Sequence, residues 1–378
     1  MSSDPAFRRD ANGVFHVGAD DDVALCRGLG QCHATDRALQ MLLMRLLGRG
    51  RVSECLQSVD VALAADTFFR RAGWHVGADE AADQLTPAAR LRCDAYCQGI
   101  NSVLPRTSPW EFRLFGYRPE PWTLADSIVL ARMTGYLTLA QSQGEIERLL
   151  VEMVQAGVGR HLLDELFPGL LNDLDEKLVA GVTLPDARMV PEAVRWRVGL
   201  PRMMASNNGV VAGSRTRSGK PMLANDPHLE TNRLPNVWYE IVLEAPGRYV
   251  MGATMPGLPA VLVGRTNELA WGVTYAFMDS IDSWVEDCRD GCCRRGDDRW
   301  EAPRRRTEVI LRRKKPSVEL SVYENEHGLL EGDPHRPGRY LATRWSAAQS
   351  GPVSLDCLLR LWDARCEPID RLIGAARP

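Results

Sequence analysis

The stretch RMMASNNGVVAG, residues 202–213, separates two kinds of sequence in this chain of 378 residues. Before it, apolar residues recur with the three- and four-residue spacing of amphipathic helices. After it, short runs rich in β-branched residues alternate with glycine, proline and asparagine turns, which is typical of a largely antiparallel sheet. Helices first and strands afterwards predict an α+β fold rather than an alternating α/β fold.

The helical half is most evident in residues 21–50, where five leucines form one stripe that ends at Gly48 and Gly50. Thr123 and Asp126 have the three-residue spacing of a helix N-cap, in which each side chain satisfies a free backbone N–H group. Further helices are predicted over residues 86–104, 123–139, 143–157 and 159–166.

The composition changes almost at Ser206, and the segment before it reads as a connector. Prolines at positions 185, 191 and 201 interrupt any regular pattern there. We therefore expect three regions: a helical region over residues 1–180, a connector over 181–205 and a sheet-rich region over 206–378.

The overall composition excludes some classes of partner. The net charge is only −3 and charged residues make up 25% of the chain, so neither nucleic acid nor membrane is indicated as a partner. No apolar run approaches the length of about 18 residues expected of a spanning helix, and no signal peptide is evident. Ten cysteines without a repeated framework favour reduced thiols. We expect a cytoplasmic protein.

Two local patterns have plain interpretations. Cys288, Cys292 and Cys293 lie close together in the sequence, but no second pair or matching histidine accompanies them, so zinc is not favoured. The basic segment over residues 303–316 alternates apolar and charged residues, as one strand of a hairpin does. A solvated edge strand protected by arginine and lysine fits it better than a nucleic-acid patch.

Ser206 is the candidate nucleophile. The chain has no G-x-S-x-G elbow, and its seven histidines leave a conventional triad open without nominating one. A serine can instead use its own α-amine as base once the chain is cut before it, because that amine has a pKa of about 7.7–8.0. Such chemistry needs a small residue before the serine and a strand after it, which Ala205 and the pair Val210-Val211 supply. The same pattern is also typical of an ordinary turn.

Residues 206–286, SNNGVVAGSRTRSGKPMLANDPHLETNRLPNVWYEIVLEAPGRYVMGATMPGLPAVLVGRTNELAWGVTYAFMDSIDSWVE, resemble the start of the β-subunit of penicillin acylases. These enzymes, also called penicillin amidases, are N-terminal nucleophile hydrolases. The upstream stretches GLGQCHATDRALQMLLMRLLGRGRVSE and FGYRPEPWTLADS resemble signatures of the α-subunit. The resemblance covers nearly the whole chain and implies the αββα sandwich of that family, incomplete in this chain.

The resemblance implies a role for each matching residue. Ser206 would cut the Ala205–Ser206 bond and then act as the catalytic nucleophile of an amidohydrolase, with its freed α-amine as base. His228 matches a polar position near the nucleophile, although a histidine hydrogen-bonded within the sheet is the alternative. Tyr275 matches the residue whose backbone N–H forms one side of the oxyanion hole. The implied substrate is an acyl amide, and the implied assembly is a self-processed α/β heterodimer.

The segment FMDSID resembles the calcium loop of the family. The implied oxygen ligands are Asp279, the carbonyl of Ile281, Asp282 and, from the helical half, Glu145. Carboxylates with a carbonyl suit a hard cation, and the ion would join the two halves of a cut chain. An acidic turn without an ion is the alternative.

The chain departs from the family pattern at two places. Gly209 stands where relatives usually carry an aromatic residue, and Pro378 ends the chain just before the expected oxyanion-hole asparagine. We therefore expect a fragment, a truncated reading frame or one piece of a split gene, and a catalytically impaired remnant is the alternative function. A β-lactam side chain, an acyl-homoserine lactone and an N-acylated peptide all remain open as substrates. Gly135 and Leu139 match positions near the acyl pocket.

Overall fold

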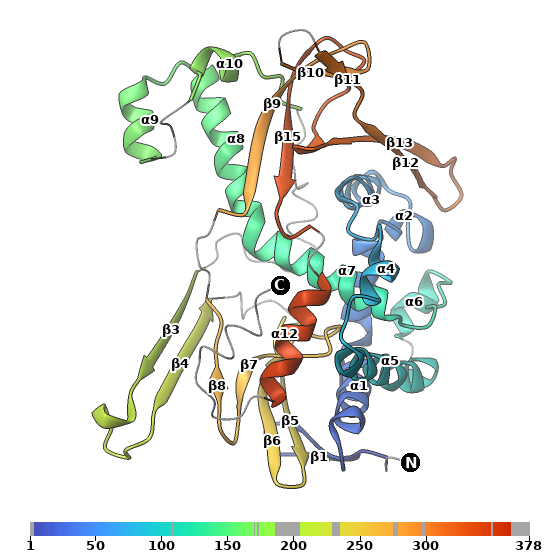
Figure 1. Ribbon diagram of the computed structural model, residues 1–378. Coiled ribbons are helices and arrows are strands. Elements are labelled where there is room, and N and C mark those ends of the chain that lie inside the picture. Colours follow the sequence, from blue (N-terminus) through green and yellow to red (C-terminus); the bar gives the residue numbers. More distant parts are fainter. Residues whose placement is uncertain are drawn as a thin grey trace.

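The computed structural model describes residues 4–107, 109–169, 171, 174–185, 205–228, 235–274, 279–296, 299–348 and 351–363 (Figure 1). Apart from a short N-terminal hairpin, the first half is helical. Its helices are α1 (Asp22–Gly48), α2 (Val52–Cys55), α3 (Asp60–Ala72), α4 (Ala78–Ala82), α5 (Pro87–Thr107), α6 (Trp110–Leu114), α7 (Leu124–Gly135), the π-helical turn η1 (Tyr136–Ala140), α8 (Gln141–Gln155), α9 (Arg160–Leu166) and α10 (Glu176–Ala180). Among the described residues, no helix combines the length and apolar character needed to span a bilayer.

A six-stranded sheet combines two strands from the N-terminus with four strands from the second half of the chain. In spatial order its strands are β1 (Ala6–Arg9), β2 (Phe15–Gly18), β5 (Tyr239–Ala245), β6 (Arg248–Thr254), β7 (Val261–Thr266) and β8 (Ala270–Trp271). The pair β2 and β5 is parallel, and the other pairs are antiparallel. The N-terminal hairpin is therefore held by the part of the chain that follows the connector.

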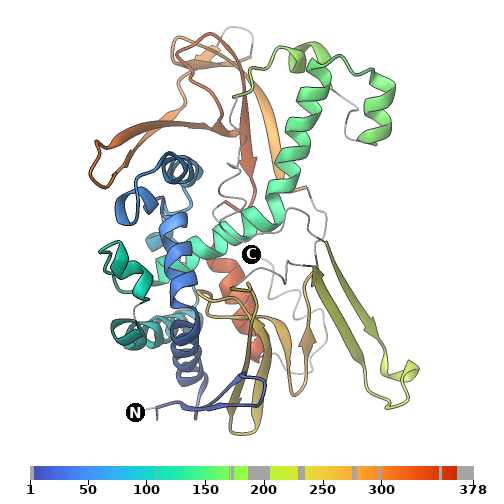
Figure 2. The same ribbon diagram turned by 180° about the vertical axis from the view of Figure 1, so that it is seen from behind.

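The second sheet has seven strands and lies at the other end of the molecule (Figures 1 and 2). Every described pair in it is antiparallel. The expected α+β class, with helices before a largely antiparallel sheet region, is confirmed. In spatial order its strands are β11 (Arg299–Glu301), β10 (Cys292–Arg295), β9 (Ile281–Arg289), β15 (Gly338–Trp345), β14 (Gly328–Leu330), β13 (Val318–Asn325) and β12 (Arg304–Ile310).

The elements α7, η1 and α8 form one helical run that crosses the middle of the molecule and reaches the seven-stranded sheet (Figures 1 and 2). The capping box of Thr123 and Asp126 begins this run, as the sequence predicts. The two separate helices expected over residues 123–139 and 143–157 are instead continuous, because a π-helical turn joins them. The C-terminal helix α12 (Gly351–Asp363) packs on the main apolar core through Leu355, Leu359 and Trp362.

The basic segment forms β12, and β12 is an edge strand, as expected. One of its arginines also contacts the helical half of the protein. Arg306 donates to the carbonyls of Arg70 and Arg71 at 3.0 and 2.9 Å and so satisfies the C-terminal end of α3. Glu308, which is 8% exposed, pairs with Arg70 at 3.1 Å. This strand therefore fastens the seven-stranded sheet to the helical half.

Helices α1 and α5 approach each other backbone to backbone at two glycines. A Cβ atom on Gly30 would lie 2.1 Å from the carbonyl oxygen of Tyr96, and one on Gly99 would lie 2.0 Å from the carbonyl oxygen of Arg27. Both distances are far inside van der Waals contact, and the atoms met belong to helix backbones that cannot rotate away. Only glycine permits this crossing.

His33 of α1 links the crossing to the six-stranded sheet. Its Nδ1 lies 2.7 Å from the hydroxyl of Tyr96, and its Nε2 lies 2.8 Å from Oγ1 of Thr254. Thr254 donates its own proton to the carbonyl of Tyr239, so Nε2 of His33 must be the donor and Nδ1 the acceptor. Burial lowers the pKa of His33 to about 3, so the ring stays neutral.

Replacement of the crossing glycine should disrupt the helical half. We expect Gly30→Ala to lower the free energy of unfolding by about 3 kcal/mol or more, because the methyl group overlaps a rigid carbonyl. Gly18→Ala is the matched control, since a Cβ there meets nothing within 4 Å. Denaturant unfolding measures both, and equal losses in the two variants would contradict the crossing.

The neutral state of His33 predicts a loss of stability in acid. In the unfolded chain His33 takes up a proton near pH 6.5, whereas in the folded chain it is protonated only near pH 3. Stability is therefore present above pH 6.5 and is lost as the pH falls. Between pH 7 and pH 5 the free energy of unfolding of wild type relative to His33→Gln should fall by about 2 kcal/mol. A difference that stays constant over this range rules out a neutral buried His33.

Candidate functional site

Ser206 lies at the start of a separate two-stranded ribbon. Strand β3 (Ala205–Val211) pairs in antiparallel register with β4 (Met222–His228), and Ser206 is opposite Pro227. Figure 1 shows this ribbon standing apart from the two larger sheets. The connector residues 186–204 lie outside the described residues, so the site is defined from Ala205 onward.

The hydroxyl of Ser206 is held by the segment that follows β8. Its Oγ donates to Oγ1 of Thr274 at 2.8 Å. Oγ1 of Thr274 in turn donates to the carbonyl oxygen of Ser206 at 3.1 Å. Thr274 comes directly before Tyr275, which lies outside the described residues. The expected oxyanion donor is thus the chain neighbour of the residue that contacts the candidate nucleophile.

Asn225 on β4 joins the ribbon to the same segment. Its Nδ2 donates to the carbonyls of Asn207 and Val273, both at 2.8 Å, and its Oδ1 accepts from the N–H of Val273 at 3.1 Å. Gly272 fits beneath this link because a Cβ there would lie 2.8 Å from side-chain atoms of Asn208 and Asn225. The bonds of Asn225 to Val273 and of Ser206 to Thr274 therefore attach the thin ribbon to the body of the protein.

The structure does not bring His228 together with Ser206. In the ladder His228 is opposite Ala205, and successive side chains of a strand point to opposite faces. His228 and Ser206 therefore lie on different faces of the ribbon. Nε2 of His228 lies 2.8 Å from Oδ2 of Asp226, and the His228 side chain is 44% exposed. A role for His228 near the nucleophile stays a prediction.

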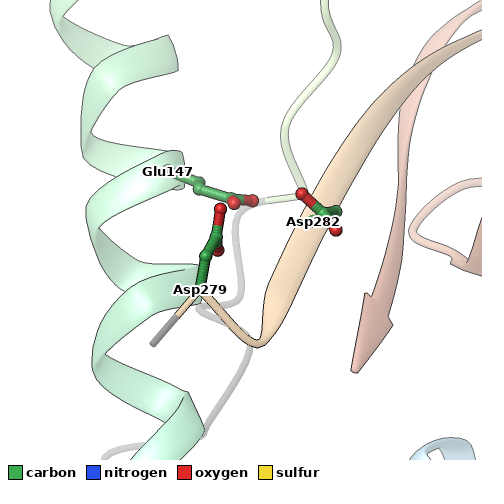
Figure 3. Close-up of side chains that lie close together, drawn as sticks. All are labelled: Glu147, Asp279 and Asp282. Carbon is green, nitrogen blue, oxygen red and sulfur yellow. The ribbon is translucent and has the colours of Figure 1, made fainter. Parts of the chain in front are cut away.

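A cluster of three carboxylates joins α8 to the start of β9. Glu147, Asp279 and Asp282 have ligand oxygens within 4.8 Å of one another, as Figure 3 shows. The loop is fixed in place because Oε1 of Gln143 on α8 accepts from both the N–H and the hydroxyl of Ser280, at 3.0 and 2.7 Å. Two distant parts of the chain thus present acidic oxygens to one point.

Glu147 occupies the place that the sequence reading assigned to Glu145. Residues two apart on a helix lie about 200° apart around its axis, so only one of the two can face β9. Glu145 accepts instead from Gln141 at 2.8 Å. Ile281 begins β9 between the two aspartates with its side chain fully buried. The segment GEIE contains both glutamates, and the sequence alone did not say which of them faces the loop.

Within the described part of the chain, Glu147 forms no ion pair with an arginine, lysine or histidine. Oε2 of Glu147 is buried and has no hydrogen-bond partner among the described residues. Burial, together with the negative charges of Asp282 and Asp279, raises the pKa of Glu147 to about 7, although a bond from Ser283 opposes this. Three converging carboxylates, one with a buried oxygen that has no hydrogen-bond partner among the described residues, are a suitable ligand set for a hard cation such as calcium.

The two residues expected near the acyl pocket are Gly135 and Leu139. Gly135 ends α7, and a Cβ there would be in ordinary contact with the ring of Trp345 at 3.5 Å. Leu139 lies in η1, and its side chain is outside the described set. Thr274 and Asn225 were missed by the sequence reading, because nothing in their local patterns shows that strands far apart in the chain meet there.

Comparisons with known proteins extend over nearly the whole chain. The acyl-homoserine lactone acylase QuiP of Pseudomonas aeruginosa is 29% identical over 100% of this chain and 47% of its own length. Penicillin acylase 2 proenzyme of Pseudomonas sp. (strain SE83) is 30% identical over 96% of this chain and 48% of its own length. The chain thus spans about half the length of the curated relatives it matches.

A solved structure and a family description complete the comparison. The tetragonal form of the thermostable penicillin G acylase from Alcaligenes faecalis is 24% identical, covers 50% of this chain and 100% of that chain, and has a TM-score of 0.38. Residues 6–366 match the family described as penicillin amidase. The family match confirms the expected N-terminal nucleophile hydrolase fold, of which this chain covers a part. On the strength of that match, the chain belongs to the penicillin amidase family.

Proposed function

We propose that this chain carries the nucleophile of an acyl-amide hydrolase and that Ser206 is that nucleophile. The observation that carries the proposal is the penicillin amidase family match, since the matched residues 6–366 include Ser206. The bond between the hydroxyls of Ser206 and Thr274 supports it, because Oγ of Ser206 is already oriented. One relative is named a proenzyme, which agrees with a chain that is cut before it acts.

The proposed chemistry begins with the chain's own peptide bond. Oγ of Ser206 attacks the carbonyl carbon of Ala205, the C–N bond breaks, and the acyl group passes to oxygen as an ester. The broken bond frees the α-amine of Ser206, which takes the hydroxyl proton, and water then hydrolyses the ester to release the Ala205 carboxylate and restore the Ser206 hydroxyl. In each later turnover that amine accepts the hydroxyl proton while Oγ attacks the substrate carbonyl. The leaving amine takes the proton, and water releases the acid.

The substrate class follows from the same comparison. Relatives carry the names acyl-homoserine lactone acylase and penicillin acylase, and both kinds of compound contain an acyl group joined to nitrogen. We infer that this chain acts on amides of that kind, with the backbone N–H of Tyr275 as one donor to the developing oxyanion. A catalytically impaired relative is the alternative, and the experiment on Ser206 below separates the two.

The two pieces produced by the cut are proposed to stay together as an α/β heterodimer. Strand β2 from the first piece pairs along its length with β5 from the second. Arg306 from the second piece binds carbonyls of α3 in the first. His33 and Thr254 share a buried hydrogen bond across the same boundary. Separation would break all three sets of contacts at once.

We also propose that calcium binds between Glu147, Asp279 and Asp282, with the carbonyl of Ile281 as a further oxygen. The buried Oε2 of Glu147, which has no partner among the described residues, supports this choice of ligand. A bound cation would offset three converging negative charges and would tie α8 to β9. The ion is structural in this proposal and takes no part in the chemistry at Ser206.

Replacement of the nucleophile should abolish both cutting and turnover. Intact mass and N-terminal sequencing of the wild type should show residues 1–205 and a piece beginning at Ser206, whereas Ser206→Ala stays uncut. Hydrolysis of a chromogenic acyl amide should fall at least ~10⁴-fold in that variant. Ser214→Ala, a nearby serine change, should be cut normally. An uncut and inactive wild type would favour the impaired relative, and identical cutting in Ser206→Ala would refute the assignment.

Calcium should stabilise the wild type but not Glu147→Gln. At a calcium concentration of 100 times Kd, the wild-type free energy of unfolding should rise by about 2.7 kcal/mol over its value in chelator. In chelator at pH 8, Glu147→Gln should be the more stable protein, because its side chain carries no buried charge. Glu145→Gln is the matched control and should keep the calcium response. Loss of the response in Glu145→Gln alone would identify Glu145 as the ligand in place of Glu147.

A further inference from the structure

Cys288 and Cys293 face each other across the β9–β10 hairpin. Asp290 and Gly291 form its two-residue turn with φ values of 52° and 81°, which is the type I′ geometry. In such a hairpin the residues that flank the turn, Arg289 and Cys292, form the hydrogen-bonded pair. The next pair, Cys288 and Cys293, is therefore a non-hydrogen-bonded pair, in which the two strands bring their side chains closest.

The two sulfur atoms are already close. Their Sγ atoms lie 3.3 Å apart, and the thiols are 1% and 0% exposed. The Cα separation of about 4.5 Å typical of such a pair falls within the range that a disulfide needs. A bond of about 2.04 Å requires the sulfurs to approach by about 1.3 Å, which side-chain rotation supplies without moving the strands.

We propose that Cys288 and Cys293 form a cross-strand disulfide when the chain meets a low-molecular-weight disulfide such as oxidised glutathione. One cysteine thiolate attacks the small disulfide, forms a mixed disulfide and releases one thiol. The other cysteine then attacks the protein sulfur of that bond and releases the second thiol. Two protein thiols and one small disulfide thus become one protein disulfide and two small thiols. This site is separate from the proposed hydrolase chemistry.

Cys293 is the better first nucleophile of the pair. The contact with the Cys288 thiol lowers the pKa of Cys293, and the positive charge of Arg295 acts in the same direction against burial. The pKa of Cys288 is raised by the same contact and by burial. The sulfurs lie one residue pair from the turn, so opening of the hairpin tip exposes them without unfolding the sheet.

Cys292 serves as an internal reference. It precedes Cys293 on β10, and neighbouring side chains of a strand point to opposite faces, so it cannot face Cys288 in this register. It is also partly exposed, whereas the pair is buried beside Leu330 and Tyr340. A thiol reagent should therefore reach Cys292 first, while the disulfide should form without it.

Mass spectrometry under non-reducing conditions tests the proposal on the full chain. After exposure to oxidised glutathione and alkylation of free thiols, trypsin separates the two sulfurs by cutting after Arg289. We expect residues 266–289 linked to residues 290–294 in the wild type and in Cys292→Ser, and no link after dithiothreitol. Cys293→Ser should yield no link. A link that persists in Cys293→Ser, or full alkylation of both thiols in the wild type, overturns the proposal.

Thermal unfolding is a second test of the disulfide, and it leaves Cys288 and Cys293 unchanged. A disulfide closing this short loop should raise the Tm of oxidised Cys292→Ser by roughly 2–5 °C, and dithiothreitol should reverse the rise. An unchanged or lowered Tm in the linked protein would show that the bond strains the hairpin, which contradicts a disulfide that forms without moving the strands. These outcomes can be read even if variants of Cys288 or Cys293 fail to fold.

Discussion

Two helices can touch backbone to backbone only where neither carries a side chain, and the crossing of α1 and α5 at Gly30 and Gly99 is such a place. The close approach brings Tyr96 within reach of His33, and His33 in turn reaches Thr254 of the six-stranded sheet. That sheet ends at β8, whose continuation holds Ser206 through Thr274. The placement of the candidate nucleophile thus depends on a helix contact in a different part of the fold.

The sequence predicts what is local in this fold. The leucine stripe and its terminal glycines indicate α1 closely, and Thr123 with Asp126 forms the cap that their spacing predicts. It does not reveal the π-helical turn of η1, because a uniform helical period has no signal for an inserted residue. The alternation along β12 was recognised, yet its inward face carries Arg306 and Glu308, which are matched to α3 rather than to water.

The candidate site was predictable in part for the same reason. The break in pattern at residues 202–213 and the family resemblance both indicate Ser206, but the contacts of Asn225 and Thr274 join strands that are tens of residues apart. The cation cluster shows the limit clearly. Which of two glutamates on one helix faces a loop depends on the rotation of that helix, and the rotation is set by packing rather than by the glutamates themselves.

Glu286 and Glu308, two buried carboxylates of the seven-stranded sheet, have positive partners, and Glu147 of the cation cluster differs from them in this respect. Glu286 is 2% exposed and pairs with Arg295 at 2.6 Å, and Glu308 pairs with Arg70. Such pairing offsets the cost of removing a charge from water. Glu147 has two aspartates as neighbours instead. Its balance of charge must come from a proton or from a bound cation.

The parallel pairing of β2 with β5 joins residues more than two hundred positions apart, on either side of the bond before Ser206. Contacts of such long sequence separation form slowly, since a large loop must close before they are made. An uncut chain closes that loop within one molecule. A cut chain has no loop to close, so its recovery after unfolding becomes an encounter of two molecules and varies with their concentration. After the cut, the lifetime of the folded protein would then be set by its rate of unfolding, since refolding of the two pieces is slow.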